Sequence, residues 1–400
     1  MNKQFLASIL TLLLCTSVMA APVAYRLEDF EGPGVMGNAG LVNVQGNSLA
    51  KVGISPDLAL GPIEVGFDMN AYIPLNGATV PAELQWFSLR HVGFDFENVA
   101  GLKWGRLTNV TYGYGLVMDH YDSGAGGSGE FTTDKAGVKG YLQLDPIRVD
   151  AMVTAKNLKA ARLSYLWSDS FLLNWPLAIG TTYVTDDGVS ATPVPGNSVT
   201  RPQVSALGVD LAFPVGGDFL TFYLEGSQLM DKDNAILGRG ASAGMKGDLM
   251  SFFEYRAEYR RLGAGFVPGY FGQDYEASSF TFPTDAPQKD INGFLISAGA
   301  QVNDIFKVGL GFEGYDDRAP LLTGALGWHS LFNTVGVINY SMPFQAQGNH
   351  TLSSTIHYKT GGAFDYIVSV KREYVASGAF NETVSVGTQV NLTKAFGLPF

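Results

Sequence analysis

Apolar and polar residues alternate along most of this chain. Between residues 63 and 71, for example, Ile63, Val65 and Phe67 are apolar, and Glu64 and Asp68 lie between them. A period of two residues is typical of a β-strand with one apolar and one polar face. The pattern is clearest in residues 63–71, 110–118, 147–154, 207–213, 306–313 and 384–392. Over residues 50–392 it predicts about twenty strands of roughly 8–13 residues, close to the ~9–11 that a tilted membrane-spanning strand needs.

The predicted connections alternate between short and long in the second half of the chain. Short turns are expected near residues 216–217, 247–248, 303–304, 332–333 and 361–362. Longer connections, rich in Gly, Asp, Asn and Pro, are expected at residues 227–238, 262–290, 314–320, 343–350 and 375–382, and earlier at 119–135 and 186–202. This spacing predicts a sheet with brief turns at one end and extended loops at the other.

The two faces of the predicted strands differ in a way that separates membrane from soluble architectures. In residues 253–261, aromatic and small residues occupy one face and four charges occupy the other: Glu254, Arg256, Glu258 and Arg260. A charged row of this kind cannot face hydrocarbon, where an Arg at the bilayer midplane costs about 2–4 kcal/mol. We therefore expect the apolar rows to face lipid and the charges to face an enclosed aqueous lumen. The alternative is a soluble sandwich, which would bury the apolar rows between two layers.

The amino-terminal residues have the features of a secretory signal. Lys3 precedes an apolar run over residues 5–14, and Val18, Met19 and Ala20 form a cleavage site of the small-residue type. We assign residues 1–20 to this signal, which contains Cys15, the only cysteine of the chain. Residues 21–48 lack a regular pattern and are interpreted as a periplasmic tail, a lumen plug or an additional strand, and residues 49–400 as the barrel.

The amino-acid composition limits the classes of molecule that this chain is expected to bind. The chain has 26 basic and 37 acidic residues, a formal net charge of −11, and only 16 % charged residues. Nucleic acid is not an expected partner, because binding it requires clustered Lys and Arg. Disorder is excluded by the 46 % of hydrophobic residues.

The carboxyl end completes the pattern. An alternating apolar stretch finishes on an aromatic residue, through Val384, Val386, Val390, Leu392, Phe396, Leu398 and Phe400. This end resembles the terminal assembly signal of bacterial outer-membrane β-barrel proteins, although no named porin family is indicated, and the last regular strand is expected to end near Leu392. The resemblance implies an all-β, transmembrane, antiparallel up-and-down β-barrel of about 16–20 strands. It also implies a location in the outer membrane of a Gram-negative bacterium, with outer-membrane lipid and the outer-membrane assembly machinery as partners.

The functional hypothesis follows from the width of the predicted barrel. Barrels of about sixteen strands or more normally enclose an aqueous channel or a plug. We therefore expect a porin-like channel for passive diffusion of small hydrophilic solutes or ions, with selectivity set by lining charges. The alternative is a non-conducting barrel that acts as a surface receptor, adhesin or assembly scaffold, with residues 21–48 or 262–290 in the bore. A homo-oligomer is compatible with either hypothesis.

The candidate pore-lining residues are the charged residues on the polar faces of the predicted strands. They are Glu64, Asp68, Lys103, Arg148, Asp150, Asp210, Glu225, Glu254, Arg256, Glu258, Arg260, Lys307 and Glu313. For each of them the alternative role is an ion pair that stabilises the barrel wall.

We find no residue motif for covalent, metal or cofactor chemistry in the sequence. The histidines His91, His120, His329, His350 and His357 lack the spacing of a metal site. Two G-x-G-x-x-G matches, at Gly309 and Gly124, lie in a predicted strand and a predicted loop and do not begin a helix. We therefore expect no enzymatic activity, no cofactor and no metal.

Overall fold

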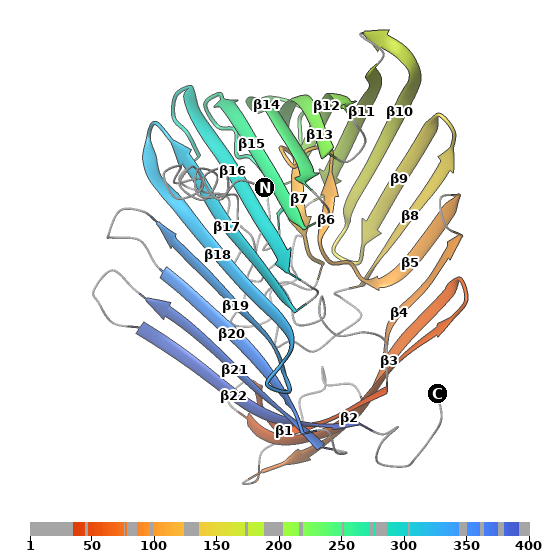
Figure 1. Ribbon diagram of the computed structural model, residues 1–400, viewed down its shortest axis with the longest axis vertical. Coiled ribbons are helices and arrows are strands. Elements are labelled where there is room, and N and C mark those ends of the chain that lie inside the picture. The colour runs from red at the N-terminus through yellow and green to blue at the C-terminus, as the bar shows by residue number, and fades with distance from the viewer. Residues whose placement is uncertain are drawn as a thin grey trace, which may run out of the picture.

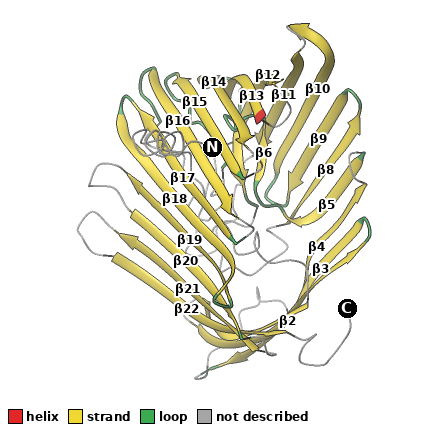
Figure 2. Cartoon of the chain, viewed as in Figure 1, coloured by secondary structure: helices red, strands yellow, loops and turns green. Residues whose placement is uncertain are grey.

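The structure is a computed structural model that describes residues 35–44, 47–75, 77, 86–96, 99–123, 136–172, 175–187, 203–215, 219–249, 252–272, 275–276, 286–302, 305–343, 350–360, 364–374 and 380–391. These residues form 22 strands, and 20 of them belong to one antiparallel sheet (Figure 1; Figure 2). A separate hairpin contains β6 (Val110–Tyr112) and β7 (Met118–Tyr121).

The first half of the sheet runs through residue 186. Its strands are β1 (Val35–Val44), β2 (Asn47–Leu60), β3 (Ile63–Pro74), β4 (Phe87–Phe96), β5 (Ala100–Arg106), β8 (Ala136–Leu144), β9 (Ile147–Thr154), β10 (Leu158–Leu172) and β11 (Trp175–Asp186).

The second half begins at residue 204. Its strands are β12 (Val204–Val215), β13 (Leu220–Asp231), β14 (Ile236–Leu249), β15 (Phe253–Leu262), β16 (Ile291–Val302), β17 (Phe306–Tyr315), β18 (Arg318–Leu331), β19 (Thr334–Pro343), β20 (His350–Lys359), β21 (Phe364–Tyr374) and β22 (Phe380–Asn391).

The sheet closes into a barrel. Each strand pairs antiparallel with the sheet strands before and after it in the chain, and β5 pairs with β8 across the hairpin insertion. The last strand, β22, pairs with β1, where residues 36–40 lie opposite residues 387–391. No strand of the described ring is therefore left with an unpaired edge, which lipid could not hydrogen-bond. The predicted all-β, up-and-down antiparallel barrel of about 16–20 strands is confirmed.

The outer face of the barrel is apolar. On β9, Val149 and Val153 are 41 % and 43 % exposed, whereas Asp150 between them is 7 % exposed. The same alternation exposes large apolar side chains on many strands, among them Ile63, Phe94, Leu102, Leu142, Leu163, Ile179, Val209, Leu224, Phe294, Leu310 and Val368. Rows of this extent would drive association in water, and lipid is the environment that covers them. The apolar rows are not buried between two layers, so the sandwich alternative is wrong.

The two ends of the barrel differ in loop length. At the end where β1 begins and β22 ends, which we call the turn end, the connections have two to four residues. At the opposite end, which we call the loop end, residues 107–135, 187–203 and 263–290 are long connections. The predicted asymmetry is confirmed, but the predicted long loops at 227–238 and 314–320 are wrong. Strands β13, β14, β17 and β18 extend into them and leave only residues 232–235 and 316–317 as turns.

Two further expectations from the sequence need revision. Residues 110–118, predicted as a spanning strand, form the separate hairpin instead, because positive φ angles at Asn109, Gly113 and Gly115 break the extended chain. Residues 35–44, within the segment 21–48, form β1 and residues 47–48 begin β2, so these residues belong to the barrel wall. Residues 21–34 lie outside the described residues. The barrel needs β1 because it supplies the partner of β22.

Other expectations fall outside the described residues. The proposed signal, residues 1–20, and residues 392–400 with the terminal aromatic residue both lie there. The last described strand ends at Asn391, as expected. Among the described residues, no helix has both the length and the apolar character that crossing a membrane would require.

Candidate functional site in the barrel lumen

A hairpin folds into the lumen from the loop end. It comprises residues 107–123, which we call the lumen hairpin, and contains β6 and β7 (Figure 1). Its side chains are buried on both faces, with Leu116, Val117, Met118 and Tyr121 at 0 % exposure. A strand with one face toward lipid would not bury both faces. The hairpin instead packs against inward-facing residues of the barrel wall.

A second segment enters the lumen beside the hairpin. It comprises residues 263–272 and 275–276, which we call the lumen segment, between β15 and β16. The backbone N–H of Gly269 donates to the carbonyl of Leu116 at 2.9 Å, and the N–H of Phe271 donates to the carbonyl of Val117 at 3.2 Å. These bonds, with a parallel bridge between Met118 and Phe271, join the two insertions.

An apolar core lies inside the barrel where the insertions meet the wall. The hairpin supplies Leu116 and Val117, and the lumen segment supplies Phe266 and Phe271. The wall supplies inward-facing apolar residues near the loop end: Met152, Leu158, Ala160, Val184, Val204, Ala206, Leu229, Leu262 and Ile291. Gly240 permits close packing, because a Cβ atom there would meet the ring of Phe266. Burial of this apolar surface fixes both insertions against one side of the lumen.

Polar contacts hold the lumen segment at its far end. The Glu276 carboxylate accepts hydrogen bonds from the hydroxyls of Tyr121 and Thr154, the latter at 2.8 Å. The Lys156 ammonium donates to the Glu276 carbonyl at 2.8 Å, and the Tyr275 hydroxyl donates to Asp186 at 2.7 Å. The lumen segment is thereby tied to both the hairpin and the wall.

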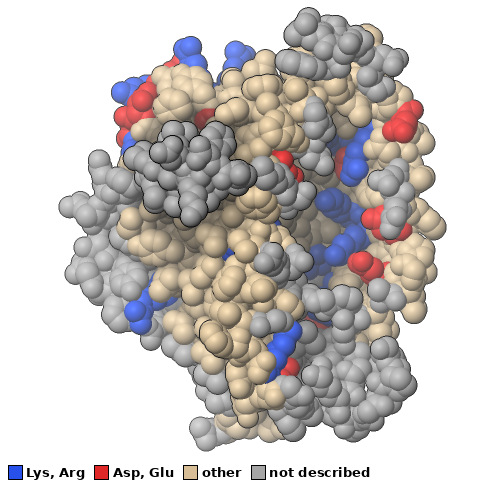
Figure 3. Space-filling model, viewed as in Figure 1, with Lys and Arg blue, Asp and Glu red and all other residues tan. Residues whose placement is uncertain are grey.

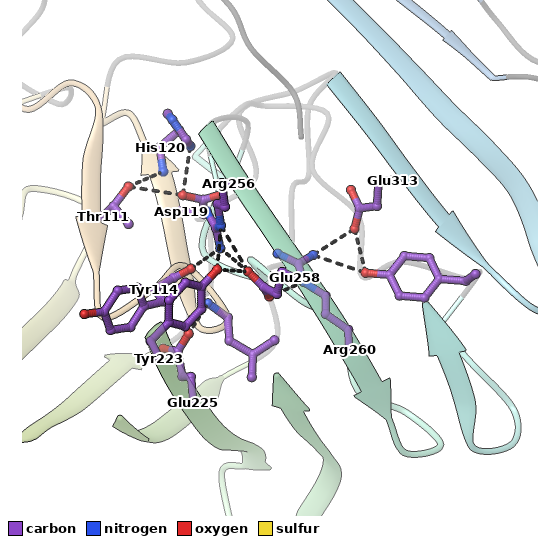
Figure 4. Close-up of polar contacts among 12 residues, drawn as sticks. Thr111, Tyr114, Asp119, His120, Tyr223, Glu225, Arg256, Glu258, Arg260 and Glu313 are labelled. Carbon is purple, nitrogen blue, oxygen red and sulfur yellow. Dashed lines mark hydrogen bonds and ion pairs between the residues drawn. The ribbon is translucent and has the colours of Figure 1, made fainter. Parts of the chain in front are cut away.

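A charged network crosses the inner face of β15 (Figure 4). Its centre is Glu258, which is 3 % exposed. This carboxylate accepts hydrogen bonds from Arg256 at 2.5 Å, from Arg260 at 2.6 Å and from the Tyr223 hydroxyl at 2.7 Å. Arg260 also donates to Glu313 at 2.9 Å. The alternation predicted for residues 253–261 places these three residues on one inward face, and their opposite charges compensate one another's burial.

The network continues into the lumen hairpin. The ring of Tyr114 stacks on the ring of Tyr223 at 4.0 Å between centroids, and the Tyr114 carbonyl accepts a hydrogen bond from Arg256. The backbone N–H of Leu116 donates to Glu225 at 3.1 Å, so this carboxylate holds the hairpin tip (Figure 4). The Lys246 ammonium lies 4.8 Å from the centroid of the Tyr114 ring.

The protonation states of the hairpin residues at neutral pH are compatible with this arrangement. Burial, followed by the negative charge of Asp210, raises the pKa of Tyr114 to about 12. The phenol is therefore neutral at physiological pH. Burial opposes ionisation of Asp119, but its hydrogen bond to His120 and the charges of Arg256 and Arg260 bring its pKa below the usual value. Asp119 therefore keeps its negative charge in neutral and mildly acidic solution.

Further ion pairs line the inner wall. Arg162 on β10 makes two hydrogen bonds to Asp210 on β12, at 2.6 and 2.9 Å. Arg148 makes two to Asp150 on β9, at 3.0 and 2.9 Å. A Cβ atom at position 180 would overlap the Arg162 guanidinium and the Asp210 carboxylate, so a larger residue there would displace this ion pair.

Two lysines on the inner wall lack a close ion-pair partner among the described residues. Lys103 on β5 and Lys139 on β8 are direct cross-strand partners. Both point inward, because Leu102 and Leu142 occupy the exposed outer positions of the same strands. Neither ammonium makes a salt bridge within the part of the chain that the structure describes. Like charges directly opposite each other are destabilising unless water or anions screen them.

The structure separates the thirteen predicted lining residues into three groups. Seven are in close ion pairs, which is the wall-stabilising alternative: Arg148, Asp150, Asp210, Arg256, Glu258, Arg260 and Glu313. Three make looser pairs at 3.7 Å: Asp68 with Arg90, and Glu254 with Lys307. The remaining three are Glu225, which binds the hairpin, and Glu64 and Lys103, which are exposed. A role of these residues in solute passage stays a prediction.

Sequence reasoning missed several residues of the lumen. Arg162 and Lys139 occupy inward positions that the alternation of their strands could have revealed. Tyr114 and Tyr223 could not have been assigned to the network, nor could Tyr315, whose hydroxyl accepts a hydrogen bond from Arg260 at 3.1 Å. An aromatic residue in such a strand is equally expected at the lipid interface. Among the described residues, no cluster of His, Cys, Asp or Glu has a geometry that could hold a metal ion.

Comparison with known proteins gives distant likenesses only. No family model matches the chain, and no curated protein matches it. One similar solved structure is Wzi of Escherichia coli, an outer-membrane protein that is involved in group 1 capsule assembly and is described as a carbohydrate-binding β-barrel. It has a TM-score of 0.40 and 10 % identity, over 89 % of this chain and 83 % of that chain.

Two structures from Pseudomonas aeruginosa resemble this chain about as much as Wzi does. OpdK with vanillate has a TM-score of 0.39 and 8 % identity, over 89 % of this chain and 96 % of that chain. OccK11 (OpdR) has a TM-score of 0.38 and 10 % identity, over 92 % of this chain and 99 % of that chain.

The architecture defines the class of this protein. A closed antiparallel barrel with an apolar exterior, inward charges and short turns at one end is a bacterial outer-membrane β-barrel. Its twenty strands enclose a lumen that the two insertions partly fill.

Proposed function

We propose that this barrel is a channel for passive diffusion of small hydrophilic solutes or ions, with no covalent step. The main support is the cross-strand pair of Lys103 and Lys139 on the inner wall, because like charges placed directly opposite each other are favoured where water and counterions screen them. Figure 3 shows Lys and Arg side chains gathered in a hollow on this face of the molecule, with acidic side chains nearby. Such a lining favours polar solutes over apolar ones.

The lumen hairpin sets the width of the proposed pathway. It and the lumen segment occupy the side of the lumen next to β9–β16. Solutes therefore pass beside these insertions, along the wall that carries the lysine pair. The ion-pair network under the hairpin keeps its position fixed during passage.

Conductance of the purified protein in a planar lipid bilayer tests this function. We expect discrete, ohmic single-channel steps that persist at both signs of the applied voltage. Incorporated protein that gives no steps would contradict the channel and favour the receptor, adhesin or scaffold alternative. The apolar core between the two insertions and the wall is the observation that favours this alternative.

Charge reversal at the lysine pair tests the solute pathway. In Lys103→Glu/Lys139→Glu we expect the reversal potential in a salt gradient to shift toward that of a more cation-selective channel, with a several-fold change in the permeability ratio. These lysines are better targets than Arg256 and Arg260, since reversal of the latter would break the buried network.

The matched control is Lys232→Glu, a charge reversal in the exposed turn at residues 232–235. This variant should keep the parental selectivity. Equal reversal potentials for the parent and the lysine-pair variant would reject the role of this wall in solute passage.

A further inference from the structure

A groove lies on the outside of the barrel at the loop end, away from the lumen network. It has a volume of about 580 Å³ and lies between the start of β14, the end of β15 and the residues just before β16. Its lining includes Arg239, Arg261 and Asp290, together with the small residues Ala241, Gly263 and Ala264. We call it the rim groove.

The two arginines of the rim groove face outward. Gly238 and Gly240 on β14 are buried, because Phe266 of the lumen segment packs against their inner side. Arg239 and Ala241 take the alternate, exposed positions. Ala241 is the direct cross-strand partner of Arg261, so the two arginines are diagonal neighbours on one face, with Cα atoms about 7–8 Å apart.

Aromatic residues fix the depth of the groove in the membrane. Tyr259 and Phe294, which are 43 % and 55 % exposed, make an edge-to-face contact with ring centroids 5.4 Å apart on the outer face. Exposed aromatic pairs of this kind mark the interface between hydrocarbon and headgroups. Arg261 lies two residues beyond Tyr259 toward the loop end, on the same face, which places its guanidinium at the level of lipid headgroups.

The charge of the groove is only partly compensated. Arg261 contacts Asp290 at 3.4 Å, and both side chains are largely exposed. The Arg239 guanidinium makes no ion pair within the residues that the structure describes. Two guanidinium groups facing one carboxylate leave a net positive charge and free N–H donors, a combination that suits a phosphate group.

We propose that the rim groove binds a phosphate-bearing glycolipid of the outer leaflet. Arg239 and Arg261 contact a phosphate of its headgroup, and an acyl chain runs toward the membrane over Ala241 and Ala243, whose small side chains leave room for it. The outer leaflet is indicated because long connections of outer-membrane barrels lie on the extracellular side. This site is independent of solute passage through the lumen.

Native mass spectrometry of the full-length protein in detergent tests the proposal. The probes are diphosphoryl lipid A, the same lipid without its phosphates, and phosphatidylglycerol. We expect the parent protein to retain diphosphoryl lipid A most strongly. Arg239→Ala/Arg261→Ala should weaken this binding by about tenfold or more, which is the effect expected for lost charge-assisted hydrogen bonds.

Two further variants distinguish lipid binding at the rim groove from a general effect of mutation. Ala241→Leu keeps both charges but fills the groove, and it should also weaken binding. Lys232→Ala removes an exposed cation from a neighbouring turn at the same end and should leave binding unchanged. Equal retention of dephosphorylated lipid A, equal retention of phosphatidylglycerol, or unaltered binding in the double-arginine variant would overturn the proposal.

Discussion

Replacement of Glu258 by glutamine is expected to destabilise the barrel by about 3–5 kcal/mol, the usual cost of breaking a buried ion pair from one side. The carboxylate is the shared acceptor of Arg256, Arg260 and Tyr223, and the glutamine side chain cannot neutralise two arginines. The free energy of unfolding, measured by urea titration of the refolded protein in detergent, reports this change.

The control lies on the same face of the same strand. Glu254 is exposed and lies 3.7 Å from Lys307, so Glu254→Gln should cost less than about 1 kcal/mol. If Glu258→Gln were no more destabilising than Glu254→Gln, the network would have no role in stabilising the wall.

Removal of most of the lumen hairpin is expected to widen the pathway. Replacing residues 110–121 with a short Gly-Ser linker deletes β6 and β7 together with the contacts of Tyr114 and Leu116. Single-channel conductance should rise by about twofold or more, since the open cross-section of a pore controls its conductance. Openings should also become noisier, because the lumen segment loses its backbone bonds to the hairpin.

Shortening a connection that does not enter the lumen provides the comparison. Substitution of residues 232–234 by Gly-Ser leaves both insertions intact and should keep the parental conductance. A hairpin deletion that inserts and opens with parental conductance would show that the hairpin does not restrict the pathway.

Much of the barrel could be predicted from local alternation. In the row from Glu254 to Arg260, every second residue is charged. In a barrel that spans lipid, such a row can face only the enclosed aqueous interior. The structure places Arg256, Glu258 and Arg260 on that inner face. The strand number followed from the same periodicity, since each spanning strand carries its own alternating apolar row.

The lumen hairpin escaped prediction for a physical reason. Tyr112, Tyr114 and Leu116 alternate with glycines as a lipid-facing strand would, but the partners that bury them lie more than a hundred residues away, as for Leu116 and Glu225. Local pattern does not report such contacts. Positive φ angles at Asn109, Gly113 and Gly115 break the strand, but glycine is also common within barrel strands, so the sequence does not reveal the break.

The interior apolar core was hidden in a similar way. Leu262 and Arg260 lie on the same inward face of β15, yet one is in the core and the other in the charged network. This change from charged to apolar marks where the lumen segment covers the wall. In the sequence alone, an apolar residue at the end of a strand has no evident meaning.

Spin labelling of two adjacent residues on β10 tests the central claim most directly. Leu163 is 49 % exposed on the outer face, and Ser164 faces inward between Arg148 and Gly180 of the neighbouring strands. Nitroxides are attached to Leu163→Cys and Ser164→Cys, each in a Cys15→Ala background, and the protein is placed in lipid vesicles. The account predicts that the label at 163 collides mainly with oxygen, which partitions into hydrocarbon, and the label at 164 mainly with a water-soluble nickel chelate. The reverse order at the two positions would contradict it.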